Sequence, residues 1–150
     1  MKPIFEKKKE AYTIIAGCGR LGANLANTLS GEGASVLIID SNKDAFRKLS
    51  PEFTGIALAG DAAMLNTLHD AQIEKATTVV SVTNNDNTNT LVAQIAKEMF
   101  GIEHVIARLY DPECECVYQE LNIDTICPAV LSMKEINKLL NVPGDMVGGA

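Results

Sequence analysis

The stretch Tyr12-Thr-Ile-Ile-Ala-Gly-Cys-Gly-Arg-Leu-Gly22 constrains this chain more than any other. It joins a short apolar run, which predicts a strand, to glycines at the G-x-G-x-x-G spacing. Gly17 permits a tight turn, Gly19 lets a pyrophosphate approach the backbone, and Gly22 lets the next helix lie close to the strand. The N-terminus of that helix offers unpaired N–H groups and a partial positive charge. The stretch therefore predicts a site for a phosphate-bearing ligand.

An acidic residue ends the next apolar run, at a sequence distance from the glycine turn that is typical of dinucleotide-binding folds. Residues 36–39 predict a second buried strand that ends at Asp40. Asp40 lies close to the roughly 20-residue offset at which a dinucleotide fold holds ribose hydroxyls. The alternative is a helix cap, a role for which Ser41 competes. The complete strand–helix–strand unit favours the ribose role, and a carboxylate there makes NADP the least favoured nucleotide because it repels a 2′-phosphate.

Composition narrows the class of protein. A chain of 150 residues, 47% of them hydrophobic, predicts one globular domain with a sizeable core. A net charge of −6 argues against a nucleic-acid-binding surface. No apolar run is long enough for a membrane span, and residues 1–10 lack the apolar core of a secretory signal. We expect a flexible arm at 1–10 and a flexible tail at 142–150.

The cysteines do not form a metal or disulfide pattern. No C-x-x-C pair occurs among Cys18, Cys114, Cys116 and Cys127, and only two histidines are present. A zinc site is therefore disfavoured, and reduced thiols of a cytoplasmic protein are expected. Cys18 precedes a helix N-terminus that could lower its pKa. The favoured interpretation is a small residue that fills a tight turn.

Strand and helix patterns alternate along the rest of the chain. Further strands are expected at 54–58, 78–82, 104–109 and 124–127, and helices at 24–30, 45–49, 64–71, 87–100, 112–121 and 129–140. This alternation predicts an α/β fold: a Rossmann-like, doubly wound parallel six-stranded sheet of order 3-2-1-4-5-6, with helices on both faces. Ligands of such sheets bind between the carboxyl ends of strands 1 and 4.

Apolar side chains at helical spacing suggest which helix faces are buried. These are Leu21, Leu25 and Leu29 in the first helix, and Leu91, Ile95 and Met99 in the longest one. In the last helix Ala129, Met133, Ile136 and Leu140 lie on one side.

Polar residues gather after the predicted strands. Arg20 opposes the helix dipole, so a phosphate partner explains it better than stability does, although a solvated arginine is the alternative. Asp61 either caps a helix or lies near an adenine. The loop 83–87 caps the next helix through Asp86 or a neighbouring Asn, and Thr83 with Asn84 faces the ligand. Arg108 ends an apolar run and needs an anion, with a phosphate and an inter-subunit carboxylate as equal candidates.

Several of these segments together resemble the RCK N-terminal domain family, also called the TrkA-N or KTN module, of bacterial potassium uptake and channel gating. The resemblance covers about residues 12–140, within a domain at 11–141. The segments are Gly17-Cys-Gly-Arg-Leu-Gly22, Asp40, Gly60-Asp-Ala62, Val82-Thr-Asn-Asn-Asp86, Val105-Ile-Ala-Arg108 and Cys127-Pro128.

The resemblance implies a regulatory subunit that is not an enzyme. It would be cytoplasmic and peripheral to the inner face of the membrane through a potassium transporter partner. It would bind NAD(H) or an adenine nucleotide (AMP, ADP or ATP) and control transport through a ligand-dependent ring. Assembly would run from dimer to octameric ring, or join this chain to a longer RCK subunit; no nucleic acid is implied. The residues expected at the nucleotide are Gly17, Cys18, Gly19, Arg20, Leu21, Asp40, Ser41, Lys43, Gly60, Asp61, Ala62, Thr83, Asn84 and Arg108.

The chain departs from the family pattern in two places. It stops where a C-terminal RCK domain is expected, so it is either a fragment or a short subunit that pairs with a fuller one. Ala129 replaces the acid that some members carry after the proline, so no metal is predicted there. The last helix either packs on its own sheet or crosses to a neighbouring subunit.

Two other functions are alternatives to a nucleotide-sensing regulator. A short-chain oxidoreductase needs Tyr-x-x-x-Lys, but Cys114 follows Tyr110 at that spacing and Asn122 follows Tyr118. A scaffold subunit with an empty cleft is the third possibility.

Overall fold

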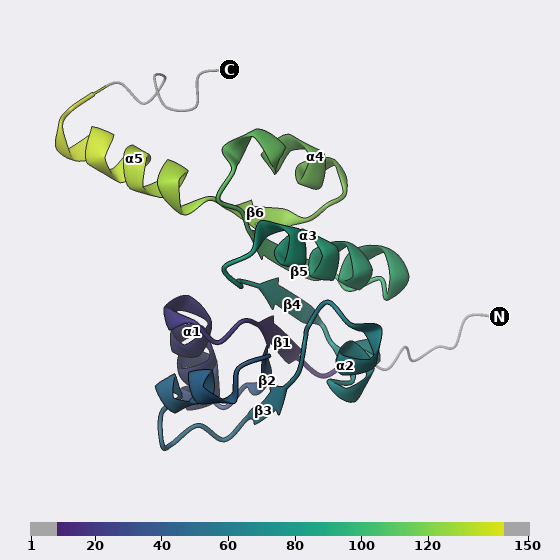
Figure 1. The fold of residues 1–150 in the computed structure, drawn as a ribbon. Helices are drawn as coiled ribbons and strands as arrows, with labels where there is room; N and C mark the ends of the chain where they lie inside the picture. The colour runs from purple at the N-terminus through teal and green to yellow at the C-terminus, as the bar shows by residue number, and fades with distance from the viewer. Residues whose placement is uncertain (1–8, 143–150) are drawn as a thin grey trace.

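A single parallel sheet organises residues 9–142, which are the residues that the computed structural model describes (Figure 1). The strands are β1 (Tyr12–Ala16), β2 (Ser35–Asp40), β3 (Ile56–Ala59), β4 (Thr78–Ser81), β5 (His104–Arg108) and β6 (Asp124–Ile126). Their order is β3-β2-β1-β4-β5-β6, and the paired strands run parallel. The predicted doubly wound Rossmann-like fold is confirmed.

Helices cover both faces of the sheet. On one face lie α1 (Arg20–Gly31) and the 3₁₀ segment η1 (Lys43–Lys48). The other face carries α2 (Leu65–Asp70), the 3₁₀ segment η2 (Ile73–Lys75) and α3 (Asp86–Gln94), which continues as a π-helical turn, η3 (Ile95–Met99). The chain then forms η4 (Pro112–Cys114), α4 (Glu115–Glu120) and α5 (Pro128–Leu139).

The core has two layers because side chains alternate along each strand. Ile14, Leu37 and Val79 pack toward α2 and α3. Their neighbours Ile15, Ile38 and Val80 pack toward α1. Burial on both faces explains why these strands are continuous apolar runs.

The helix faces predicted to be buried are confirmed only in part. Leu25, Leu29 and Ile95 are partly buried and pack against the core, but the other three large side chains are exposed. Small residues of α1 face the sheet (Gly22, Ala23, Ala26 and Ser30), whereas Leu21 is 43% exposed. Along α3 and η3 the buried residues are Asn89, Val92, Ala93 and Ala96, whereas Leu91 and Met99 are 43% and 60% exposed. Small side chains let a helix axis approach a sheet closely, so the larger ones lie at the flanks.

Helix α5 does not pack on its own sheet. It contains no buried residue, and Figure 1 shows it extending away from the sheet beyond β6. Met133 and Ile136 are 50% and 52% exposed. The own-sheet alternative for this helix was therefore wrong. Within residues 9–142, no helix combines the length and apolarity needed to cross a membrane.

The expected arm and tail fall almost entirely at residues 1–8 and 143–150, which lie outside the described residues. Their proposed role as flexible ends stays a prediction.

Candidate functional site

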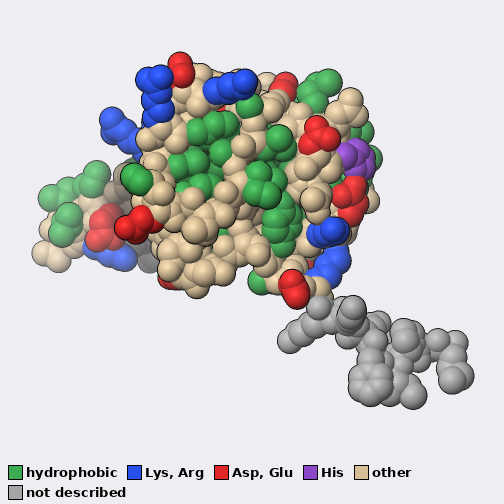
Figure 2. All heavy atoms as spheres, turned by 90° about the horizontal axis from the view of Figure 1, so that it is seen from below, with side chains coloured by type: hydrophobic (Ala, Val, Ile, Leu, Met, Phe, Trp, Pro, Cys, Tyr) green, Lys and Arg blue, Asp and Glu red, His purple; other side chains and the backbone are tan. Residues whose placement is uncertain are grey.

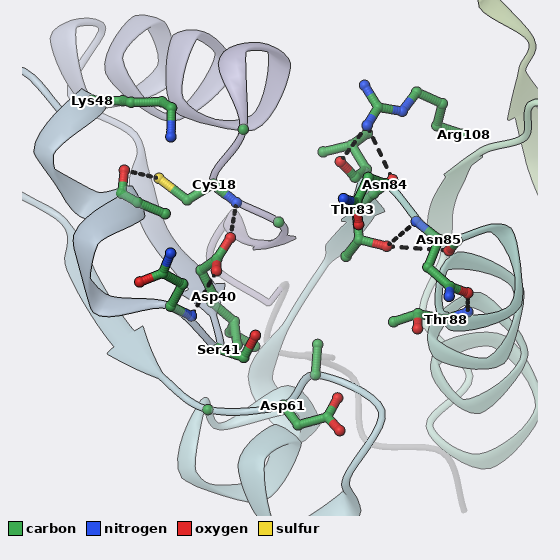
Figure 3. Close-up of a pocket in the computed structure, with 18 residues that line it drawn as sticks. Cys18, Asp40, Ser41, Lys48, Asp61, Thr83, Asn84, Asn85, Thr88 and Arg108 are labelled. Atoms are coloured by element: carbon green, nitrogen blue, oxygen red, sulfur yellow. Dashed lines mark hydrogen bonds between the residues drawn. The ribbon is translucent and has the colours of Figure 1, made fainter.

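A cleft of about 520 Å³ opens at the carboxyl ends of the strands, where the strand order reverses (Figure 3). One side, which we call the turn wall, comes from residues 17–19, 39–42, 45, 48 and 60–62. The opposite side, the loop wall, comes from residues 82–85, 88 and 108. Figure 3 shows the two groups facing each other across the cleft.

The three glycines of the turn serve different purposes. Gly17 has φ +108°, and a Cβ there would lie 2.9 Å from the backbone of Val82 and Thr83. A Cβ on Gly22 would lie 1.8 Å from the Gly17 carbonyl oxygen, so Gly22 lets α1 start against the turn itself. Around Gly19 a Cβ would meet nothing within 4 Å, and its φ of −79° suits any residue. The protein's own packing therefore does not require glycine at position 19.

Helix α1 begins at the cleft without a side-chain cap. Gly19 is the N-cap residue and supplies no capping hydrogen bond. The first N–H groups of a helix lack partners within it and carry partial positive charge. An anion above Gly19 would accept hydrogen bonds from these N–H groups and balance their partial positive charge, and the open space at Gly19 leaves room for it.

Cys18 is a buried filler of the turn, as the favoured interpretation held. Its side chain is fully buried, and its Sγ donates to the Ala45 carbonyl at 3.4 Å. Burial raises the pKa of the Cys18 thiol above 9.0, and the nearby Asp40 carboxylate raises it further. The expectation that the helix N-terminus could lower the pKa of this thiol is therefore wrong.

Asp40 binds the turn wall together. Its Oδ2 accepts from the Cys18 N–H and its Oδ1 from the Asn42 N–H, both at 2.8 Å. The helix-cap alternative was wrong for Asp40 and Ser41, because Asn42 caps η1 by accepting from Asp44 N–H. Each carboxylate oxygen of Asp40 keeps a lone pair that could accept from a hydroxyl.

Asp61 closes a local turn at the opposite end of this wall. Its Oδ1 accepts from the Ala63 N–H at 2.9 Å, whereas the N-cap position of α2 is Met64. The cap alternative for Asp61 was wrong as well. Figure 3 shows Asp61 below Asp40 and Ser41 on the same side of the cleft.

Side chains hold the loop wall. The Oδ1 of Asn85 caps α3 by accepting from Thr88 N–H at 3.0 Å, so a neighbouring Asn is the cap, as one of the two alternatives predicted. Asp86 instead accepts from Tyr110 N–H at 2.9 and 3.0 Å and from Asp111 N–H at 3.2 Å. It thereby joins the start of α3 to the chain after β5.

Arg108 reaches the cleft from the end of β5. Its Nη2 donates to the carbonyls of Val82 and Thr83 at 2.9 and 3.0 Å, and its guanidinium lies 5.3 Å from the Tyr110 ring centroid. Its Nε is buried and has no hydrogen-bond partner among the described residues. The two candidate anions, a phosphate and an inter-subunit carboxylate, both lie outside this chain, so an anion partner for Arg108 stays a prediction.

Sequence reasoning missed the most connected polar residue near the site, Asn89. It is fully buried in α3 and bonds to Ser81, Thr83 and Arg108. One signal was available: position 89 is in phase with the small apolar residues Val92, Ala93 and Ala96, and a buried Asn must find partners.

Most of the predicted site residues line the cleft. Eleven do so, namely Gly17, Cys18, Gly19, Asp40, Ser41, Gly60, Asp61, Ala62, Thr83, Asn84 and Arg108. Arg20, Leu21 and Lys43 are exposed and do not line it. Asn42, Lys48, Asn85 and Thr88 also line it and were not predicted. Among residues 9–142, no cluster of three or more His, Cys, Asp or Glu side chains could hold a metal ion.

Comparison with protein families agrees with this geometry. Residues 13–128 match the model of the TrkA-N domain. The chain belongs to the TrkA-N domain family. The resemblance drawn from the glycine turn, Asp40 and Arg108 is thereby confirmed.

Among curated relatives of this TrkA-N chain is the Trk system potassium uptake protein TrkA of Streptomyces coelicolor, with 42% identity over 115 residues. The match covers 77% of this chain and 52% of that protein, so the chain spans about half the length of this relative. The relative is named for potassium uptake and not for a catalysed reaction, in agreement with the prediction that the chain is not an enzyme.

Solved structures share the TrkA-N fold at low sequence identity. The TrkA-N domain of the inner membrane protein ybaL from Escherichia coli has a TM-score of 0.76 at 18% identity, over 86% of this chain and 96% of that one. The Kef CTD of Shewanella denitrificans, in an AMP-bound form, has a TM-score of 0.69 at 22% identity, over 91% and 86% of the two chains.

Proposed function

We propose that this chain is the nucleotide-sensing part of a potassium transport regulator, and that its cleft binds NAD(H) or an adenine nucleotide. The observation that carries the proposal is the uncapped start of α1 beside the open space over Gly19. A phosphate-bearing ligand accounts for both features, and packing within the protein accounts for neither.

The residues of the turn wall fit a nucleotide. Phosphate would lie over Gly19 at the α1 N-terminus, and the spare lone pairs of Asp40 would accept from ribose hydroxyls. Asp61 and Ala62 would flank the adenine. The cleft volume of about 520 Å³ lies within the range of small-molecule sites.

The loop wall would make the site a sensor. Thr83, Asn84 and Arg108 face the turn wall across the cleft, so one ligand could contact both halves of the sheet. A ligand shifts a conformational equilibrium only through its different affinity for the two states. A nucleotide that bridges the two walls would favour the conformation in which the distance between them fits the ligand.

The setting of this sensor is also part of the proposal. The curated relative is a potassium uptake protein, and the similar Kef structure is an AMP-bound form. We place this chain in the cytoplasm at a membrane potassium transporter, in a homo-oligomer or with a longer RCK subunit. Nucleotide binding would change the shape of the ring and thereby transport. NADP stays the least favoured ligand because Asp40 would repel its 2′-phosphate.

A matched pair of substitutions at the two ends of α1 tests the ligand site. Gly19→Ala and Gly31→Ala each add a methyl group where nothing lies within 4 Å, so both variants should fold. AMP, ADP, ATP and NADH would be titrated by calorimetry and by thermal shift, since a ligand at 100 times its Kd stabilises by about 2.7 kcal/mol. We expect binding to the unaltered chain and to Gly31→Ala, and binding at least about tenfold weaker to Gly19→Ala.

Two results would contradict the proposal. Absence of binding by the unaltered chain to all four ligands would favour the scaffold with an empty cleft. Equal binding by the two variants would place the ligand elsewhere on the molecule.

A further inference from the structure

The side chain of Asn89 lies behind the loop wall and is fully buried. Its Oδ1 accepts from Thr83 N–H at 2.8 Å, from Thr83 Oγ1 at 2.6 Å and from Ser81 Oγ at 3.2 Å. Its Nδ2 donates to the carbonyls of Thr83 and Arg108 at 3.0 and 2.9 Å. One amide therefore joins β4, the loop after it, and the end of β5.

The partners allow only one orientation of this amide. The Thr83 N–H can only donate, so it must face Oδ1, and the two carbonyls can only accept, so they must face Nδ2. A flipped amide would oppose donor to donor and acceptor to acceptor. The Asn89 side chain therefore fixes the backbone of Thr83, because it binds both the N–H and the carbonyl of that residue.

The Asn89 side chain also positions Arg108. The Thr83 carbonyl accepts from Asn89 Nδ2 and also from Arg108 Nη2, at 3.0 Å in each case. The Arg108 carbonyl is bound by Asn89 as well. Asn89 therefore holds both the backbone of Arg108 and one of the groups that orient its guanidinium, although Asn89 itself does not line the cleft.

We propose that Asn89 is a positioning residue of the nucleotide site, which sets the loop wall by fixing Thr83 and Arg108. This inference rests on the proposed nucleotide-binding function. Without the amide, the N–H and the carbonyl of Thr83 would each lose a hydrogen-bond partner. The loop wall would then sample conformations that do not bind the nucleotide. The apparent affinity of a site falls by the fraction of time that it spends in such conformations.

A merely structural role would show itself differently. A buried polar residue that only stabilises the fold would lower stability when replaced, and ligand affinity of the folded molecules would not change. Val92 is a suitable comparison, because it is fully buried on the same face of α3 and contacts the apolar core. Ser81 is a second one, since it is a buried partner of Asn89 that makes no contact with Thr83 or Arg108 among its side-chain hydrogen bonds.

The test uses the full 150-residue chain with ADP as the probe. Asn89→Asp keeps the size and the acceptor but removes both donors, and Asn89→Ser serves if the first variant does not fold. Val92→Ala and Ser81→Ala are the controls. Affinity for ADP would be measured by calorimetry well below each melting temperature. Hydrogen exchange of the ligand-free proteins would be followed at residues 82–85 and 108–110.

We expect the Asn89 variants to bind ADP about tenfold more weakly and both controls to bind within about twofold of the unaltered chain. Exchange at residues 82–85 and 108–110 should be faster in the Asn89 variants alone. Unchanged ADP affinity in an Asn89 variant, or an equal loss in Val92→Ala, would overturn the inference and leave the proposed function standing. Failure of the unaltered chain to bind ADP or any other nucleotide would overturn both.

Discussion

The two walls of the cleft are built in different ways. The turn wall depends on backbone geometry and on the Asp40 carboxylate that bonds to it: Gly17 is left-handed, Gly22 packs against the Gly17 carbonyl, and α1 starts without a side-chain cap. The loop wall depends on side chains that reach across the fold, above all Asn89 and Asp86. The turn wall has no room for added atoms at Gly17 or Gly22, whereas a wall held by side chains changes when single hydrogen bonds are lost.

The largest effect is expected from Gly22→Ala in the turn wall. The new Cβ would lie 1.8 Å from the Gly17 carbonyl oxygen, so the turn or α1 must move. We expect a loss of about 3 kcal/mol or more in the free energy of unfolding, at the upper end of overpacking effects. Urea denaturation measures it, with Gly31→Ala as the control that should stay within about 1 kcal/mol. A small loss at position 22 would show that the turn wall is pliable.

A smaller effect is expected from Asp86→Ala in the loop wall. The substitution removes the carboxylate that accepts from Tyr110 and Asp111 N–H groups. These amides lie near water, so we expect a loss of about 1–2 kcal/mol. Asp86→Asn keeps one acceptor oxygen and should lose less. If both variants lost the same amount, the link between α3 and the chain after β5 would not depend on hydrogen bonding.

The buried thiol of the turn wall gives a dependence on pH. The pKa of Cys18 is raised above 9.0 by burial and by Asp40, so the folded state holds its proton more tightly than the unfolded state does. This contribution to stability is complete below pH 9.0 and is lost as pH rises through the folded-state pKa. Denaturation series at rising pH should therefore fall less steeply above pH 9 for Cys18→Ala than for the unaltered chain. Parallel curves for the two proteins would contradict this.

The smallest effect is expected from adding a cap to α1. Gly19→Ser would place a hydroxyl at an uncapped helix start, in open space and at a permissive φ. We expect a gain of a few tenths of a kcal/mol in stability, since serine exceeds glycine only slightly as a cap. Nucleotide affinity should fall, because the hydroxyl would occupy the N–H groups proposed for phosphate. Stability and affinity that rose together would count against a phosphate over Gly19.

Residues of both walls could be predicted from the sequence, but the hydrogen bonds that hold the loop wall could not, for a physical reason. Glycines at fixed spacing, and an acid after the next strand, record a local backbone path that few other residues permit. Asn89 and Asp86 act through partners at positions 108–111, and only the folded sheet brings these together. Lys48 was missed for the same reason, since η1 carries it back over the turn.

The buried faces of α1 and α3 show a second limit. Large apolar residues at helical spacing predicted buried helix faces that include Leu21 and Leu91, yet both side chains are 43% exposed. Glycine and alanine carry little weight in a hydrophobic pattern, but they decide how near a helix lies to a sheet. The central strands β1, β2 and β4 were predicted well because they are buried on both faces and so leave no choice of face.

Helix α5 leaves Leu131, Met133, Ile136 and Leu139 between 50% and 77% exposed to water. If a second chain covers this helix, as the proposed assembly requires, the melting temperature would depend on protein concentration, because association is then part of folding. Dilution alone would then favour unfolding of such a protein, and its stability would depend on the concentration of chains as well as on the contacts within one chain.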